Sequence, residues 1–597
     1  MRTRTGALAV AMLLLSATAA GCSEDEPKAA PPPPAALSPF SIPGRGAAVP
    51  FTEYEAEAAA YRGRLVGPDR TAKTLAAEAS GRQAVTLSAT GDYVEFTLAE
   101  PANALTLRYS VPDSADGVGA DATLSVHVDG ADTLDLPVTS RYGWFYGGFP
   151  FTNNPADGSG HHFYDHARTL FDKEIPAGAK VRITKDAADT AASYTIDLAD
   201  FEQVAPPATA PDGALDVVDF GADPTGKADS AAAITAALAE GKAKKRPVWL
   251  PPGTFQVNQH LIVDQVTVLG AGMWHSVLHG RDVGLYGNYA PKPSRGVTLS
   301  DFSIIGETAE RDDHAQVNGV GGALGGGSKV QNLWIQHTKV GMWLDGPFDG
   351  LTISGNRIYD QTADGINLHR GVSNTVIEHN VIRNTGDDGI ATWADEFPDH
   401  HNTIRFNTVL LPMLANGIAI YGGHDNTVSD NVVADTLVEG GGLHVANRFG
   451  GTVFLSGTTT LTRNTTLRAG GRFEGLQAQI AAVWLYAKDG PIDADIQITD
   501  NELLDSTYGG LMFFASTIRG VTVDKLLVDS PGTFGVALLS MGEAKLSQVK
   551  VVTPGRAGLY TCPDGIAFTL TATDSTGLAD TYCGPLPDPV YRFARHG

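Results

Sequence analysis

Three aspartates lie on two neighbouring units of a repeated segment, and their type and spacing suit acid–base chemistry. Asp364 and Asp388 lie 24 residues apart, each directly before a glycine, and Asp387 precedes Asp388. One coil of the repeat is about 24 residues long, so we expect Asp364 and Asp388 to stack on neighbouring coils about 4.8 Å apart. Like charges at such a distance raise one another's pKa. The pattern therefore predicts a site that binds a cation or transfers protons, rather than three unrelated turn residues.

Candidate sugar-binding residues lie beside these acids. His369, Trp393 and Tyr421 each stand four residues beyond a repeat glycine, and Asn367 lies two residues before His369. If the coils align, the first three form a column on one outer surface. Aromatic rings there can stack on sugar, and the imidazole can hydrogen-bond a hydroxyl.

The hydrophobic alternation conflicts with exposure of the acids. Strict alternation places Asp364 on the same face as Ile366 and Leu368, which should point inward. The acids reach solvent only if the chain bends at Gly365 and Gly389.

The elements that must position this site form a long repeat. A pattern of glycine, aliphatic, any residue and apolar residue recurs through the C-terminal half. Its glycines are Gly341, Gly365, Gly389, Gly417, Gly442, Gly510, Gly535 and Gly558, with a polar hairpin-like insertion near Thr452 to Arg472. A second column, Asn356, Asn380, Asn407, Asn431 and Asn501, falls at turns, where stacked amides can hydrogen-bond along the axis. This periodicity predicts a right-handed parallel β-helix over residues 215–597.

The remaining elements complete an all-β chain. A helix from about Ser230 to Lys244 should cap the open end of the coil, an order that resembles pectin-lyase-like β-helices. Residues 51–204 alternate with period 2 and predict an antiparallel β-sandwich, followed by a linker at 205–214. An aromatic-dense loop at 141–171 could dock on the neighbouring domain or stack on sugar, and docking is favoured.

The N-terminus has the pattern of an export signal. Residues 1–21 have a basic start and a short apolar stretch, and Cys22 follows small residues as at a bacterial lipoprotein cleavage site. A plain secretory signal with an incidental cysteine is the alternative. Residues 22–50 form a Pro/Ala-rich tether that is not expected to pack. We expect an extracellular, membrane-anchored lipoprotein in which Cys562 and Cys583 form a disulfide.

The composition excludes several classes. The 597 residues carry a formal net charge of −24, so general attraction to nucleic acid or anionic lipid is not expected. We expect the lipid anchor to be the only contact with a membrane. With 68 glycines and 34 prolines the chain is unlike a helical bundle. Three cysteines are too few for a disulfide-built scaffold or a zinc array. A monomer is expected.

Two segments carry a family resemblance. Asp364-Gly365-Ile366-Asn367-Leu368-His369 and Arg383-Asn384-Thr385-Gly386-Asp387-Asp388-Gly389 resemble glycoside hydrolase family 87, the α-1,3-glucanases and mycodextranases. The resemblance implies a β-sandwich joined to a right-handed β-helix. It also implies hydrolysis of α-1,3-glucan, mutan or nigeran by Asp364, Asp387 and Asp388, without a catalytic cofactor. The family 28 polygalacturonases share the aspartate pattern, but their Gly-His-Gly and Arg-Ile-Lys motifs have no clear counterpart here.

Both families imply inversion at the anomeric carbon. Asp364 and Asp388 are too close together for opposed roles, so both are expected to position water while Asp387 is the general acid with a raised pKa.

A second resemblance concerns the sandwich. Its first and last strands resemble those of family 6-like carbohydrate-binding modules, which implies a structural calcium at Glu55, Glu57 and Asp197. A solvated edge strand without an ion is the alternative.

Two other functions stay open. A polysaccharide lyase could use Arg370 or Arg383 as its base, and a surface adhesin or binding protein would need none of the aspartates. The sequence leaves open whether cleavage is endo or exo.

Overall fold

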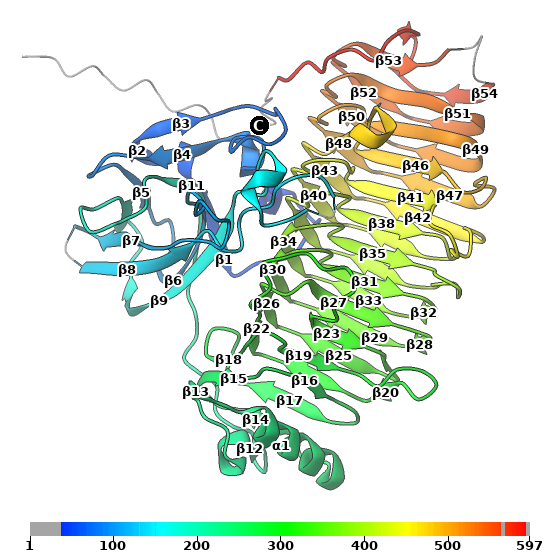
Figure 1. Ribbon diagram of the computed structural model, residues 1–597. Coiled ribbons are helices and arrows are strands. Elements are labelled where there is room, and N and C mark those ends of the chain that lie inside the picture. The colour runs from blue at the N-terminus through cyan, green and yellow to red at the C-terminus, as the bar shows by residue number, and fades with distance from the viewer. Residues whose placement is uncertain (1–36, 131, 150, 563–566, 593–597) are drawn as a thin grey trace, which may run out of the picture.

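The computed structural model describes residues 37–130, 132–149, 151–562 and 567–592. A sandwich of antiparallel sheets lies against one flank of a long parallel β-helix, so the predicted fold class is confirmed (Figure 1). Within these ranges, no helix is long and apolar enough to cross a membrane. The expected signal at residues 1–21 and Cys22 lie outside the described residues.

Two sheets build the sandwich. One has the order β3-β4-β11-β6-β9 with β1 on β11, and the other β2-β5-β10-β7-β8. The strands are β1 (Phe51–Glu55), β2 (Ala60–Arg62), β3 (Arg64–Val66), β4 (Ala84–Leu87), β5 (Tyr93–Thr97), β6 (Ala102–Ser110), β7 (Asp121–Val128), β8 (Asp132–Thr139), β9 (Asp165–Ile175), β10 (Lys180–Thr184) and β11 (Tyr194–Glu202). Alternate residues of both sheets fill one apolar core, as period 2 requires.

Strand β11 links this core to the β-helix. A bulge between Ile196 and Leu198 shifts its register, and all nine of its residues are buried. Ile196 and Phe201 point into the sandwich core. Asp200 and Glu202 contact arginines of the β-helix instead. One strand therefore serves two buried faces.

Three faces of parallel strands form the β-helix. The face that carries the aspartates has β27 (Val340–Asp345), β31 (Ile366–His369), β35 (Ile390–Trp393), β38 (Ile418–Tyr421), β41 (Leu443–Asn447) and β46 (Val483–Ala487). The second has β29 (Leu351–Ser354), β33 (Val376–Glu378), β36 (Thr403–Arg405), β39 (Thr427–Ser429), β42 (Thr458–Thr462) and β47 (Asp495–Thr499). The third has β30 (Arg357–Gln361), β34 (Val381–Thr385), β37 (Thr408–Leu410), β40 (Val432–Ala434), β43 (Thr465–Leu467) and β48 (Glu502–Leu504).

Further strands extend the coil at both ends. Toward its start lie β12 (Leu215–Asp216), β13 (Thr225–Asp229), β14 (Val248–Leu250), β15 (Gly253–Gln256), β16 (His260–Ile262), β17 (Thr267–Gly270), β18 (Ser276–His279), β19 (Gly284–Tyr286), β20 (Ser294–Arg295), β21 (Thr298–Ser300), β22 (Ser303–Ile305), β23 (Asn318–Gly322), β24 (Leu324–Gly325), β25 (Ser328–Gln331) and β26 (Trp334–Gln336). Toward its end lie β49 (Leu511–Asp524), β50 (Leu527–Asp529), β51 (Phe534–Ser547), β52 (Lys550–Val552), β53 (Ala557–Tyr560), β54 (Phe568–Thr573) and β55 (Thr581–Tyr582). Three short pairs lie outside the main faces: β20 with β24, β28 (Phe348–Asp349) with β32 (Val372–Ser373), and β44 (Arg472–Phe473) with β45 (Ala478–Gln479).

Stacked asparagines hold the coils in register, as predicted. Each amide nitrogen of Asn356, Asn380, Asn407 and Asn431 donates to the side-chain oxygen of the asparagine one coil later, at 2.8–3.0 Å. Asn464 joins this ladder and was not among the predicted members. These buried amides satisfy one another, which makes the column a structural element.

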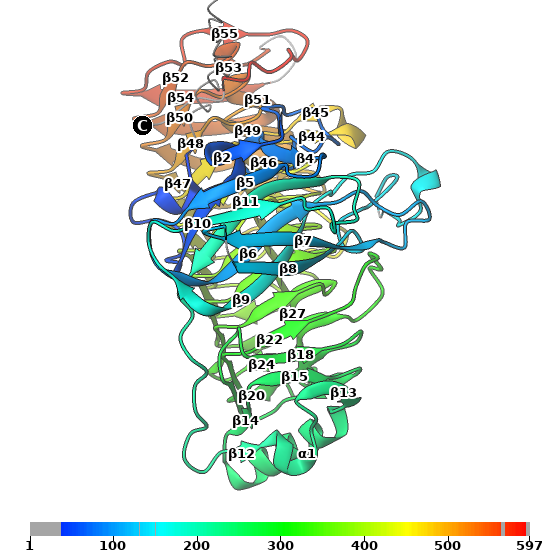
Figure 2. The same cartoon turned by 90° about the vertical axis from the view of Figure 1, so that its left-hand side faces the viewer.

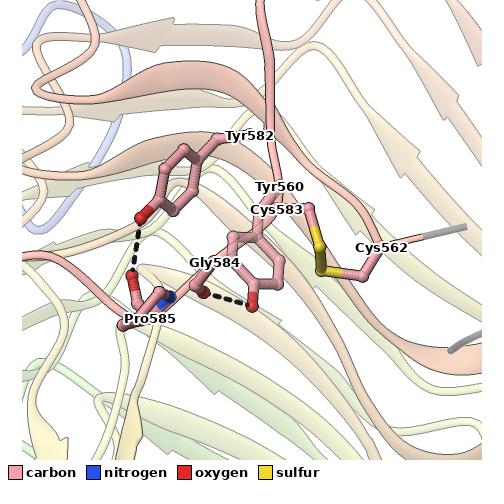
Figure 3. The surroundings of a disulfide bond; sticks show 6 residues. All are labelled: Tyr560, Cys562, Tyr582, Cys583, Gly584 and Pro585. Carbon is pink, nitrogen blue, oxygen red and sulfur yellow. Dashed lines mark hydrogen bonds between the residues drawn. A yellow bond between two sulfur atoms is a disulfide. The ribbon is translucent and has the colours of Figure 1, made fainter. Parts of the chain in front are cut away.

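The ends of the coil are closed in two ways. Helix α1 (Ala231–Lys244) covers the entry end, in agreement with the prediction, and Figure 2 shows it below the sandwich. Near the exit end Cys562 and Cys583 form the predicted disulfide, beside the hydrogen bond from Tyr560 Oη to the Gly584 carbonyl (Figure 3).

The described part of the tether corrects one expectation. Phe40 and Ala47 pack on apolar patches of the β-helix, and the Ala47 amide donates to Thr408 Oγ1 at 2.9 Å. Arg45 donates to Thr465 Oγ1 at 2.6 Å. Residues 37–50 therefore do pack, because the exposed edges of the coils offer both apolar surface and free acceptors.

Candidate active site

The aspartates lie at one end of two adjacent strands. Asp364 and Gly365 directly precede β31, Asp388 and Gly389 precede β35, and the strands pair with Ile366 opposite Ile390. A Cβ atom on Gly365 would meet the Gly389 carbonyl oxygen at 2.4 Å. The repeat glycines are therefore required by the close approach of successive coils, and the two aspartates are stacked as predicted.

The three carboxylates form one cluster. An oxygen of each of Asp364, Asp387 and Asp388 lies within 4.8 Å of the others. Asp364 accepts from Asn367 Nδ2 at 2.9 Å and from the Asp388 amide at 3.1 Å. Because Ile366 points into the core and Asp364 contacts the outward Asn367, the alternation breaks before Gly365. The structure thus resolves the conflict in the sequence pattern.

Asp388 is held by three donors. Its Oδ1 accepts from the backbone amide and Nδ2 of Asn416, at 2.7 and 2.9 Å, and its Oδ2 accepts from Tyr421 Oη at 2.9 Å. Trp484 Nε1 donates to Asn416 Oδ1 at 2.8 Å and orients that amide. These hydrogen bonds therefore hold the Asp388 carboxylate in place from two different coils, both of which follow it in the chain.

The environment changes the acidity of the stacked pair. Burial, and then the charge of Asp387, raise the pKa of Asp388 to about 7. Burial, and then the charges of Asp387 and Asp388, hold the pKa of Asp364 well above its usual range. Titration in this range suits acid–base catalysis near neutral pH.

Asp387 has a partner that the sequence did not reveal. Arg311 Nη2 lies 2.5 Å from Asp387 Oδ2, and Arg311 Nε lies 2.8 Å from Asp313 Oδ1. Burial would lower the pKa of Arg311, but Asp387 and Asp313 offset this and raise it overall. Arg311 lies in the polar loop at 306–317, between β22 and β23, where no repeat signal marks it.

The predicted column of sugar-binding side chains is present, but its members differ in their exposure to solvent. His369, Trp393 and Tyr421 align across β31, β35 and β38. His369 and Trp393 are half-buried with ring centroids 4.8 Å apart. Tyr421 is only 4% exposed and its hydroxyl binds Asp388, so the expectation of an exposed ring is wrong there. Asn367 is also buried and contacts Asp364.

The sandwich loop docks beside the cluster, as favoured from the sequence. Phe145 and Phe151 pack with Met413 of the β-helix. The Arg311 guanidinium lies over the Phe149 ring, 4.9 Å from its centroid. Residues from both domains therefore surround Asp387.

Buried ion pairs hold the domains together. Arg383 pairs with Asp200 at 2.9 Å and with Glu53 at 2.6 Å, and its side chain is fully buried. Burial would lower the pKa of Arg383, but these carboxylates raise it overall. Arg370, the other base considered for a lyase, pairs with Glu396. Arg383 is thus removed from the site and cannot serve as its base.

A cavity of about 730 Å³ is lined by residues of the sandwich and of the loop that carries Arg311. Its lining includes Asp116 and Asn153 of the sandwich and Glu307 and Glu310 of the loop. Asp364, Asp387 and Asp388 are not part of its lining.

The three expected calcium ligands differ in whether their oxygens already have partners. Glu55 Oε2 and both oxygens of Glu57 are buried without a hydrogen-bond partner. Asp197 is occupied: it pairs with Arg108 at 2.5 Å and accepts from the Ser80 amide at 2.9 Å. Burial, then neighbouring carboxylates, raise the pKa of Glu55 well above its usual range.

Comparison with known proteins decides the family. Residues 48–204 match the model of the α-1,3-glucanase catalytic domain D1, and residues 227–576 match that of domain D2. The catalytic unit of the thermostable α-1,3-glucanase from Streptomyces thermodiastaticus strain HF3-3 is 39% identical with a TM-score of 0.83, over 91% of this chain and 99% of that one. The chain belongs to the glycoside hydrolase family 87 α-1,3-glucanases.

Other members of family 87 have been solved with sugar. A catalytic domain in complex with nigerose is 29% identical with a TM-score of 0.80, over 89% of this chain and all of that one. Complexes of its variants replace one of three aspartates by alanine, at spacings of 23 and 24 residues. Asp364, Asp387 and Asp388 have the same spacings. A curated α-1,3-galactosidase A from Peterkaempfera griseoplana is 56% identical over 45 residues, 7% of this chain and 6% of that protein.

Proposed function

We propose that this family 87 protein hydrolyses α-1,3-glucosidic bonds in α-1,3-glucan, mutan or nigeran. The observation that carries the proposal is the cluster of Asp364, Asp387 and Asp388, with oxygens within 4.8 Å and raised pKa values on the stacked pair. The nigerose and tetrasaccharide complexes of relatives support the choice of substrate.

The roles follow from how each acid is held. Asp364 and Asp388 are buried and fixed by donors, so both position the attacking water, and Asp388 accepts the proton that the water releases. Asp387 is the more exposed and acts as general acid toward the leaving oxygen. Because an ion pair favours a carboxylate, this role requires the Arg311 contact to open when substrate binds.

Water attack from the side of the stacked pair, opposite the leaving group, inverts the anomeric carbon. Proton NMR of the first product anomer tests this step, and a retained configuration contradicts it.

A substrate with a good leaving group separates the roles. Fluoride needs no proton to depart, so Asp387→Asn should still hydrolyse α-nigerosyl fluoride while losing activity on glucan. Asp364→Asn and Asp388→Asn should lose both activities, because the water is no longer positioned. Hydrolysis of the fluoride by Asp388→Asn but not by Asp387→Asn would reverse the assignment of the two roles.

Substrate binding is proposed for the half-buried rings of the column. Trp393 would stack on a sugar ring, and His369 would hydrogen-bond a hydroxyl beside it. Trp393→Ala should raise KM on nigero-oligosaccharides more than it lowers kcat.

The first experiment is release of reducing sugar from α-1,3-glucan, nigeran, polygalacturonate, dextran and starch, with Asp388→Asn as the control. Release from α-1,3-linked glucans alone, absent in the control, supports the proposal. Release of reducing sugar from another polymer alone, absent in the control, contradicts α-1,3-glucan as the substrate but still supports the aspartate cluster as the active site. No release from any polymer rejects hydrolysis and favours a binding protein, whereas products with unsaturated ends indicate a lyase.

We also propose that the chain is exported and anchored through a lipid on Cys22, as the pattern before that residue suggests. Labelled palmitate should be incorporated by the full chain and not by Cys22→Ala. A plain secretory signal predicts release of both proteins without label.

A structural calcium in the sandwich is proposed at Glu55 and Glu57, whose unpartnered, buried oxygens are the ligand type that calcium prefers. The ion would neutralise these carboxylates and stabilise the fold without entering catalysis. Calcium should raise Tm in the wild type and not in Glu57→Gln; equal responses contradict the site.

A further inference from the structure

Three histidines meet on the β-helix surface, away from the aspartates. His400 and His401 lie in the turn between β35 and β36, and His424 lies in the turn between β38 and β39, one coil later. His400 and His424 form a parallel bridge, so the two turns are stacked. Asp388 precedes β35, whereas these turns follow β35 and β38, so the histidines lie at the opposite end of the strands.

The ring nitrogens converge. One nitrogen of each of the three imidazoles lies within 4.8 Å of the others. His400 Nδ1 is 2.9 Å from His401 Nδ1, and the rings of His400 and His424 are parallel with centroids 4.7 Å apart. Nitrogens around a tetrahedral zinc ion, at about 2.0–2.1 Å from the metal, are about 3.4 Å from one another. Small side-chain rotations would bring the three nitrogens to that spacing.

A carboxylate completes the donor set. Asp425 Oδ2 lies 2.8 Å from His424 Nδ1 and 4.0 Å from His401 Nε2. It can bind a cation itself or orient the imidazole of His424. Imidazole with one carboxylate suits zinc, copper or nickel, whereas calcium and magnesium prefer oxygen ligands.

The cluster is accessible from solvent. His401 is 56% exposed at its side chain and His424 is 29% exposed, so an ion can enter from solvent.

A second group of histidine and carboxylate side chains differs from this surface cluster in its burial. Asp165, His337 and Asp360 also lie together, but they are buried between the domains. His337 pairs with Asp165 at 2.7 Å, and Asp360 pairs with His166 at 2.9 Å. Those groups are buried and satisfy one another, whereas His401 and His424 are open to solvent.

We propose that His400, His401 and His424, with Asp425, form a binding site for one divalent transition-metal cation, for which Zn²⁺ is the probe. The ion joins two successive turns of the β-helix. It is separate from the aspartate cluster and does not depend on the proposed hydrolase activity.

The test is equilibrium dialysis of the tag-free, chelator-treated full chain against ZnCl₂, with bound metal counted. The wild type should bind one more Zn²⁺ per chain than His401→Ala. His379→Ala is the matched control, because His379 is an exposed turn histidine outside the cluster, and it should bind as much as the wild type. A His424→Gln variant should lose the same single equivalent.

Two outcomes overturn the proposal. One is equal zinc binding by wild type, His401→Ala and His424→Gln. The other is loss of the same equivalent in His379→Ala, which would indicate nonspecific surface binding. Circular dichroism of each variant, taken alongside, ensures that a lost equivalent is not caused by unfolding. Anomalous scattering at the zinc edge from zinc-soaked crystals should place the ion between the two turns.

Discussion

Removal of one hydroxyl should move the pH profile of the enzyme. Tyr421 Oη donates to Asp388 Oδ2 at 2.9 Å in a buried setting, and Tyr421→Phe deletes this donor without changing the ring. A hydrogen bond to a charged group contributes about 1.5–3 kcal/mol, and one pKa unit corresponds to about 1.4 kcal/mol. The variant should therefore raise the pKa of Asp388 from about 7 by about one to two units.

The sign of the effect follows from the proposed role. Asp388 must be ionised to accept a proton from water, so activity is present above its pKa and is lost as pH falls through it. Raising that pKa should lower kcat/KM about 10- to 100-fold near pH 6, with recovery at higher pH. Because the carboxylates are coupled, the measured limb belongs to the cluster.

The assay is kcat/KM against pH on a soluble α-1,3-linked tetrasaccharide. Tyr560→Phe is the matched control: its hydroxyl donates to the Gly584 carbonyl near the exit end, and its profile should equal that of the wild type. A Tyr421→Phe enzyme whose activity falls equally at every pH, with an unmoved limb, refutes the reasoning.

Three further changes test other parts of the structure. Arg311→Met removes a charge that lowers the pKa of Asp364, so the pH optimum should move upward; an unchanged optimum contradicts this. Arg383→Met leaves two carboxylates buried without their counter-charge and should lower stability by about 3–5 kcal/mol in urea unfolding. Asn431→Ala interrupts the amide ladder and should lower the free energy of unfolding by about 1–3 kcal/mol, with kcat nearly unchanged; a loss below about 0.5 kcal/mol would show that the ladder is not structural.

The repeat could be predicted because it is local. Each coil repeats the same glycine and asparagine positions, and a Cβ on Gly365 or Gly389 would collide with a neighbouring coil. The period alone therefore predicts that Asp364 stacks on Asp388, and this stacking identifies both as candidate catalytic residues. The cap, the disulfide and the sandwich follow from equally local patterns.

The surroundings of the acids could not be predicted in the same way. Arg311 reaches Asp387 across 76 residues, from a loop with no repeat signal, and Trp484 reaches Asn416 across 68 residues. The sequence predicted the column in which Tyr421 lies but not its burial, because His444 and Phe449 pack on its ring from the next coil.

The architecture and the three acids can be read from the spacing within one repeating unit. The contacts of each acid and the docking of the domains depend on the folded chain. Arg383 pairs with Asp200, which lies 183 residues away in the sequence, and Arg357 pairs with Glu202, 155 residues away. Such pairs form only when two separately patterned domains dock, and burial of those charges at the contact is a property of the folded chain alone.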